Sequence, residues 1–179
     1  MTRPGHEPER KDGTQIRPER AADTAAVRAV NRAAFETGAE AELVDALRER
    51  VEPVISLVAD ATGSIVGHIL FSPVTLSGHA ELKIMGLAPM AVRPAEQRRG
   101  IGSALVRAGL KRCRQAGCAA VVVLGHPEYY PRFGFVPASR FGIACEYDVP
   151  DEVFMAIELE PGILRDTSGT VRYHAAFPT

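Results

Sequence analysis

Hydrophobic residues recur along this chain with two spacings, and these predict strands and helices in a fixed order. Runs rich in β-branched residues favour strands, whereas apolar residues three or four positions apart favour helices. A first helix is expected after Asp23, with Val27 and Val30 buried, and a second at residues 41–50. Asp23 is expected to cap the first helix by accepting hydrogen bonds from its free amides. Strands are expected at residues 14–17, 54–59, 64–76, 82–92 and 119–124, with two more between residues 135 and 159.

The strongest helical pattern covers residues 101–116. Gly117 follows it, at the position where a left-handed C-terminal cap is favoured. Residues 119–124 are an apolar run of the length expected for a buried parallel strand. Together with the strand at residues 82–92, this helix and strand predict a right-handed βαβ unit.

Length and composition indicate a single globular domain. The chain has 179 residues, of which 46% are hydrophobic and 24% charged, an ordinary balance for one compact unit. The domain is expected to cover residues 13–165. Residues 1–12 are expected to be a flexible polar tail, and residues 166–179 a C-terminal segment packed on the domain.

Charge and cysteine content narrow the class of function. The formal net charge of -1 argues against a nucleic-acid-binding protein, which would show a basic stripe. No stretch approaches the ~20 apolar residues that span a bilayer, so a cytoplasmic protein without membrane partners is expected. Cys113, Cys118 and Cys145 lack the spacing of a zinc site. They are expected to be reduced thiols, and no metal is expected.

The segment with candidate chemistry is residues 90–106, MAVRPAEQRRGIGSALV. A helix is expected to begin at Ile101, and the first amides of a helix have no internal acceptor. Gly100 and Gly102 would let an anion approach the backbone closely. The helix dipole adds partial positive charge there. The segment therefore predicts an anion-binding cradle.

Two other anion-binding motifs are excluded by the residues present. A Walker loop needs a glycine and a lysine followed by serine or threonine, which the segment lacks. A dinucleotide-binding fingerprint needs a third glycine where Leu105 stands.

Pro89 gives independent information about the strand before the cradle. Proline cannot donate to a sheet ladder, so within a strand it marks an edge or a bulge. A strand that enters a βαβ unit is not expected at an edge, so a bulge is predicted. The bulge would free backbone groups of Met90, Ala91 and Val92 for a ligand.

Two motifs resemble the GNAT family of N-acetyltransferases. Residues 92–94, VRP, followed by residues 97–102, QRRGIG, resemble the family's acetyl-CoA loop. Residues 128–135, EYYPRFGF, resemble its Y-x-x-x-G-F segment. Residues 121–135, residues 40–47 and the ending at residues 173–177 resemble the YhbS-like branch. The resemblance implies an α/β (α+β) GNAT acyl-CoA N-acyltransferase fold. Its mixed, mostly antiparallel twisted sheet would have about six to seven strands, flanking helices and a parallel βαβ unit.

The resemblance also implies a reaction. An acetyl group would pass from acetyl-CoA to a primary amine, by direct attack in a ternary complex. The acceptor would be a small-molecule or protein amine. The resemblance, with the cradle, places the coenzyme on Met90, Ala91, Val92, Gln97, Arg98, Arg99, Gly100, Ile101, Gly102, Ser103, Tyr130 and Phe133.

Catalytic roles are assigned less completely. By its place in the family motif, Tyr130 would protonate the leaving thiolate, although it could also be a core aromatic. His126 ends a buried strand beside the proposed site and is a candidate base. The acids that remain candidates for that role are Glu36, Glu40, Glu42 and Glu81. A non-catalytic acyl-CoA sensor with the same fold, and a homodimer through the C-terminal strands, stay open.

Overall fold

The computed structural model describes residues 10–178, so the first nine residues of the expected tail lie outside the described residues. The first half contains β1 (Thr14–Pro18), α1 (Thr24–Ala34), α2 (Ala39–Arg50), β2 (Ile55–Ala61), β3 (Ser64–Leu76) and β4 (Ile84–Val92). The second half contains α3 (Ile101–Gln115), β5 (Ala120–Leu124), β6 (Val136–Pro137), β7 (Ile143–Cys145), β8 (Phe154–Glu158) and β9 (Gly169–Arg172). None of the helices in residues 10–178 is long and apolar enough to cross a membrane.

The strands form one mixed sheet in the order β1-β2-β3-β4-β5-β8-β6, with β9 joining β3 to β7. The ladders are antiparallel except for β4–β5 and β7–β9. The predicted βαβ unit, β4-α3-β5, is therefore confirmed. The described sheet has nine strands, more than expected, because β6, β7 and β9 have only two to four residues. Runs that short carry no detectable periodicity.

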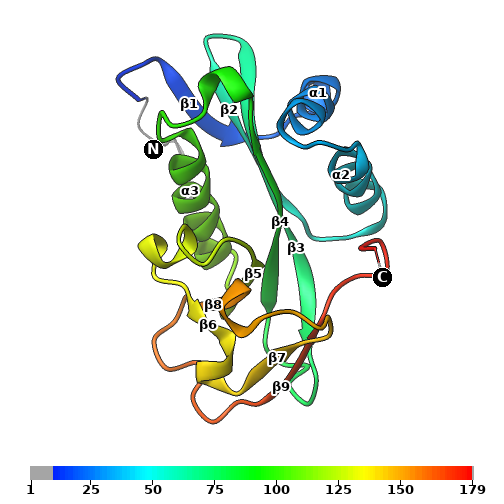
Figure 1. Ribbon diagram of the computed structural model, residues 1–179, viewed down its shortest axis with the longest axis vertical. Helices are drawn as coiled ribbons and strands as arrows, with labels where there is room; N and C mark the ends of the chain where they lie inside the picture. The colour runs from blue at the N-terminus through cyan, green and yellow to red at the C-terminus, as the bar shows by residue number, and fades with distance from the viewer. Residues whose placement is uncertain (1–9, 179) are drawn as a thin grey trace, which may run out of the picture.

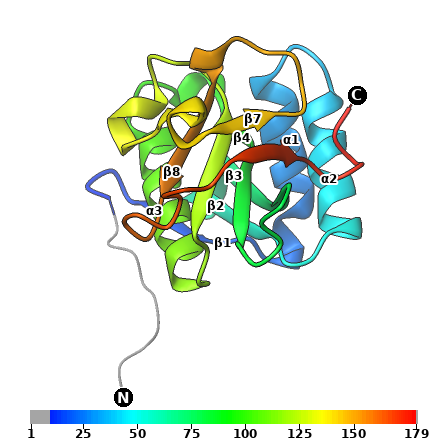
Figure 2. The same cartoon turned by 90° about the horizontal axis from the view of Figure 1, so that it is seen from below.

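Helices cover both faces of the sheet (Figures 1 and 2). α1 and α2 lie on one face and α3 on the other. Val27, Val30 and Leu47 are fully buried under the first pair, and Leu105 and Val106 under α3. Burying each such side chain contributes about 1.5–3 kcal/mol. Two apolar layers therefore hold β3 and β4 from opposite sides.

The bulge predicted at Pro89 is present. The pairing of β3 with β4 jumps from Ile69 opposite Met90 to Phe71 opposite Leu87. β4 pairs with β5 only as far as Leu87. Beyond that residue the two parallel strands part, and the rest of β4 has a neighbour on one side only.

Two expectations need correction. Asp23 does not cap α1 with its side chain. Its carboxylate accepts hydrogen bonds from the Arg17 guanidinium, at 2.7 and 3.0 Å, and from the Arg20 amide at 2.7 Å. The Arg17 contacts lower the pKa of Asp23 to about 2. The C-terminal segment, expected only to pack on the domain, supplies strand β9.

A chain of polar side chains crosses the core between α1, β2 and β3. Asn31 Nδ2 donates to Val27 O at 3.0 Å and lies 3.2 Å from His68 Nδ1, so Nδ1 is the acceptor and Nε2 carries the proton. Nε2 then donates to Ser56 Oγ at 2.8 Å, and Ser56 donates to Glu19. A histidine that donates to serine cannot act as its base, which excludes a nucleophilic Ser–His pair.

The pKa of His68 is lowered, chiefly because burial disfavours the charged ring. Unfolded His68 binds a proton near pH 6.5, whereas the folded side chain does not. Unfolding therefore takes up a proton as the pH falls, and the free energy of unfolding should decrease below about pH 6.5, by about 1 kcal/mol per pH unit. Urea unfolding at pH 7.5 and 5.5 measures this decrease. His68→Gln should show a smaller decrease over the same interval, and an equal decrease would contradict the assignment.

Candidate functional site

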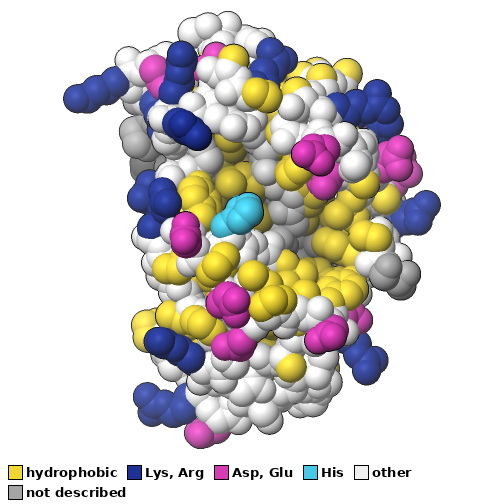
Figure 3. Space-filling view, viewed as in Figure 1, with side chains coloured by type: hydrophobic (Ala, Val, Ile, Leu, Met, Phe, Trp, Pro, Cys, Tyr) yellow, Lys and Arg dark blue, Asp and Glu magenta, His cyan; other side chains and the backbone are white. Residues whose placement is uncertain are grey.

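A cavity of about 910 Å³ opens where β4 and β5 part. Figure 3 shows a hollow across the middle of the face that it displays, with hydrophobic side chains along much of the wall of the hollow. Its lining comes from the ends of α1 and β5, the starts of α2 and α3, the second half of β4, and the segment after β9. This cavity, called the cleft below, contains most of the residues that the sequence singled out.

The loop between β4 and α3 carries the first chemical feature of the cleft. Arg98 and Gly100 have left-handed backbones, with φ of 63° and 78°, and no side chain caps α3. A left-handed non-glycine residue is strained and is often found at binding sites. The amides of Ile101, Gly102 and Ser103 make no hydrogen bond to any described residue. They lie at the positive end of the helix dipole and can hold an anion.

Arg10 fixes the other side of this loop, and no sequence motif indicates this role. Its guanidinium donates to the carbonyl of Gly100 at 3.1 Å and to that of Arg99. The carbonyls are thereby held on the Arg10 side, away from the free amides. The contact joins residues 90 positions apart, so no local pattern could predict it.

The second feature is the free side of β4. Arg93 N donates to Val66 O at 2.8 Å, and hydrogen-bonded pairs alternate along an antiparallel ladder. Ala91 therefore bonds toward β3, and the backbone groups of Met90 and Val92 point into the cleft. Gln97 Nε2 donates to Val92 O at 3.1 Å. The backbone groups of Met90, Ala91 and Val92 were all expected to be free, but those of Ala91 bond to β3 within the sheet.

Two neighbouring tyrosines line the cleft. Tyr130 is 7% exposed, and its hydroxyl makes no hydrogen bond within the described part of the chain. Burial, with a smaller effect of Tyr129, raises the pKa of Tyr130 to about 12. The hydroxyl of Tyr129 lies 3.5 Å from Ser103 Oγ, beside the free amides. Tyr129 was not among the residues predicted from the sequence, although it precedes Tyr130 in the same motif.

The structure brings most of the predicted residues together. Those that line the cleft are Met90, Ala91, Val92, Gln97, Arg98, Gly100, Ile101, Gly102, Ser103, His126 and Tyr130. Arg99 and Phe133 do not line it. Arg99 forms an ion pair with Glu96 at 2.8 Å, and the Phe133 ring packs against Tyr129 with 5.3 Å between centroids. Each of the two therefore contacts a residue that lines the cleft, Glu96 or Tyr129, without lining the cleft itself.

Only some of the candidate bases predicted from the sequence line the cleft. Glu40 and His126 line the cleft, and Glu36, Glu42 and Glu81 lie outside it.

The cysteines also lie outside the cleft, as free thiols. Burial raises the pKa of Cys113 and Cys118, which makes both poor nucleophiles. Within residues 10–178, no group of three or more His, Cys, Asp or Glu is arranged to hold a metal ion.

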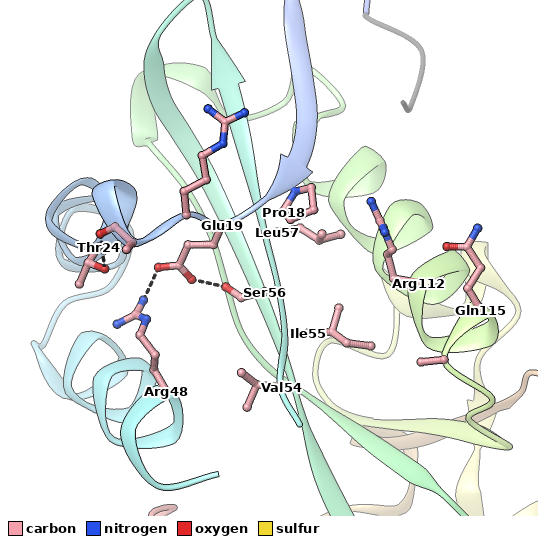
Figure 4. A pocket seen from close by; sticks show the side chains of 13 residues that line it. Pro18, Glu19, Thr24, Arg48, Val54, Ile55, Ser56, Leu57, Arg112 and Gln115 are labelled. Atoms are coloured by element: carbon pink, nitrogen blue, oxygen red, sulfur yellow. Dashed lines mark hydrogen bonds and ion pairs between the residues drawn. The ribbon is translucent and has the colours of Figure 1, made fainter. Parts of the chain in front are cut away.

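A second cavity, of about 580 Å³, lies at the sheet edge between the two helical layers (Figure 4). Arg48 and Ser56 both point toward Glu19 there, and Arg112 and Gln115 extend from α3 on the other side. The end of α3, not its beginning, lines this cavity. The negative end of the helix dipole lies there, so the cleft is the better anion site.

Comparison with known proteins agrees with this geometry. A sequence profile of the Acetyltransferase (GNAT) family matches residues 24–135. The uncharacterized N-acetyltransferase YhbS of Escherichia coli is 37% identical over 163 residues, which cover 90% of this chain and 97% of YhbS.

Two solved structures are similar over nearly the whole chain. The structure of E. coli YhbS in complex with CoA has a TM-score of 0.86 and 34% identity, and the match covers 98% of this chain and 94% of that one. A GNAT family acetyltransferase from Brucella melitensis in complex with acetyl-CoA has a TM-score of 0.77 and 39% identity, covering 93% and 99%. As its two motifs predicted, this chain belongs to the GNAT family of acetyltransferases and is a relative of YhbS.

Proposed function

We propose that this protein is an N-acetyltransferase that transfers an acetyl group from acetyl-CoA to a primary amine by direct attack. The observation that carries the proposal is the set of free amides at the start of α3, which faces a cleft between β4 and β5. Two similar structures contain CoA or acetyl-CoA. Their ligands fit the same chemistry, since a diphosphate suits a helix N-terminus.

The coenzyme would lie along the opening between the strands. Its diphosphate would accept hydrogen bonds from the amides of residues 98–103. The amide-containing arm would pair with the Met90 carbonyl and the Val92 amide, as an added strand does. The thioester would then lie near Tyr130, where the Met90 amide can donate to the oxyanion that forms during attack.

The transfer forms a C–N bond and breaks the C–S bond of the thioester. The attacking amine must lose a proton, and Glu40 and His126 are the candidate bases that line the cleft. The departing thiolate needs a proton, and Tyr130 is the candidate donor because its phenol lines the cleft. The buried thiols of Cys113 and Cys118 lie outside the cleft, which favours direct attack over an acyl-enzyme.

A valine at Gly102 should abolish coenzyme A binding. A Cβ there would lie 3.0 Å from the Tyr129 hydroxyl and 3.5 Å from the Met90 methyl, and the branched side chain would cover the free amides. Gly38→Val is the matched control, because Gly38 likewise lies at the start of a helix but has open space around it. Calorimetric titration with coenzyme A measures the effect. Binding retained by the Gly102 variant would refute the cradle.

Removing the Tyr130 hydroxyl should slow the reaction without changing coenzyme affinity. A general acid or base typically contributes about 10²–10⁴-fold in rate, and at least a several-fold decrease in kcat is expected for Tyr130→Phe. Thiol release from acetyl-CoA measures kcat, and titration measures affinity. Unchanged kcat would remove Tyr130 from the chemistry. If the wild type binds coenzyme A normally but releases no thiol with any amine, the alternative of a non-catalytic acyl-CoA sensor is favoured.

Arg10→Ala should weaken coenzyme binding, since the loop carbonyls would no longer be held in place. Losing one such contact costs about 1 kcal/mol, or about 5-fold in Kd. Lys11→Ala serves as the control, because the neighbouring Lys11 is exposed and does not line the cleft. An equal Kd for both variants would show that Arg10 has no role in organising the loop.

A further inference from the structure

The cleft has two halves on opposite faces of β4. Met90 and Val92 pack with the core under α3, whereas Ala88 and Ala91 pack with the core under α1 and α2. The coenzyme half contains the α3 start. The other half, called the acceptor half below, is formed by the end of α1, the start of α2, Pro89 and the segment after β9. That C-terminal segment runs toward α2 (Figures 1 and 2).

The walls of the acceptor half are apolar and partly aromatic. Phe35 and Leu43 line it from the helical side, and Tyr173 and Phe177 from the C-terminal segment. The rings of Tyr173 and Phe177 pack with 4.9 Å between centroids. Walls of this kind bind a flat or branched apolar skeleton and disfavour a chain that carries several charges.

Glu40 is the carboxylate of the acceptor half within the described residues. It lies in the first turn of α2, and one of its oxygens accepts a hydrogen bond from Thr37 Oγ1 at 3.3 Å. The other oxygen has no partner in residues 10–178. The other carboxylate of the cleft, Glu96, pairs with Arg99. A single negative charge beside apolar walls selects one cationic group, such as an ammonium.

Tyr173, which lines this apolar surface, also carries a polar atom. Its hydroxyl is buried and makes no hydrogen bond within the described part of the chain. The pKa of Tyr173 is raised, chiefly by burial, so the side chain stays a neutral donor. Its ring lies over Gly86, where a Cβ would be 3.1 Å away. A buried polar group without a partner is uncommon, and an oxygen atom of a ligand would satisfy it.

We propose that the acceptor is a small primary monoamine on an aromatic skeleton with one hydroxyl group. Glu40 binds the ammonium form on entry, the apolar walls hold the skeleton, and Tyr173 donates to the hydroxyl oxygen. The ammonium loses one proton to water before the nitrogen attacks the thioester, and the nitrogen loses its second proton to the base as the C–N bond forms. This inference rests on the proposed function and specifies the substrate class of the same site.

The test compares four acceptors by thiol release at saturating acetyl-CoA: tyramine, phenethylamine, spermidine and a short peptide with a free N-terminus. The kcat/KM for phenethylamine and tyramine should exceed that for spermidine and the peptide by at least about 10-fold. Tyramine should exceed phenethylamine by about 3- to 10-fold, the effect of one neutral hydrogen bond. Preference for spermidine or the peptide would overturn the inference.

Two variants separate the parts of the site. Glu40→Gln should raise KM for tyramine by about 10-fold, the effect of one charge-assisted contact. Glu42→Gln, the same change in the same helical turn but outside the cleft, should leave KM unchanged. Tyr173→Phe keeps the ring and should remove the preference for tyramine over phenethylamine. An unchanged KM in the first variant, or a preference retained in the last, would contradict the assignment.

Titration with coenzyme A distinguishes the two levels of failure. If coenzyme A binds but neither aromatic amine is acetylated, the substrate class is wrong and the coenzyme site stands. If coenzyme A does not bind, the proposed function itself fails.

Discussion

The separation of β4 from β5 is the constraint on which the rest of the structure depends. Pro89 cannot donate to a ladder, and β4 bulges at Ala88 and Pro89 while its pairing with β5 ends at Leu87. The cleft exists because the two strands part there. Backbone groups that would otherwise bond across the sheet are left for a ligand, and the start of α3 presents more of them at the same edge.

The protein keeps these groups free by satisfying their neighbours elsewhere. Arg10 donates to the carbonyls of residues 99 and 100, and Gln97 donates to the carbonyl of Val92. The backbone of Ala91 pairs with β3. The left-handed backbone at Gly100 starts α3 without a capping side chain. The two apolar cores hold β4 from both faces. A ligand therefore meets donors that are already oriented, which reduces the entropy cost of binding.

Structural features that depend on residues close together in the sequence were predicted well. Pro89 indicated the bulge, the Gly100–Gly102 pair indicated the helix start, and apolar spacing placed the long strands and helices. Contacts between distant segments could not be predicted in this way. Arg10 reaches the loop across 89 residues, and Tyr173 meets Gly86 only through β9. Asp23 matched the pattern of a helix cap, but its carboxylate is occupied by the Arg17 guanidinium, six residues earlier in β1, and by the Arg20 amide.

A crystal structure of this protein with coenzyme A would test the central claim most directly. The account predicts diphosphate oxygens about 3 Å from the backbone nitrogens of residues 98–103, with the thiol between β4 and β5 beside Tyr130. A diphosphate bound in the cavity at the end of α3, or bound only by side chains on the surface, would contradict it.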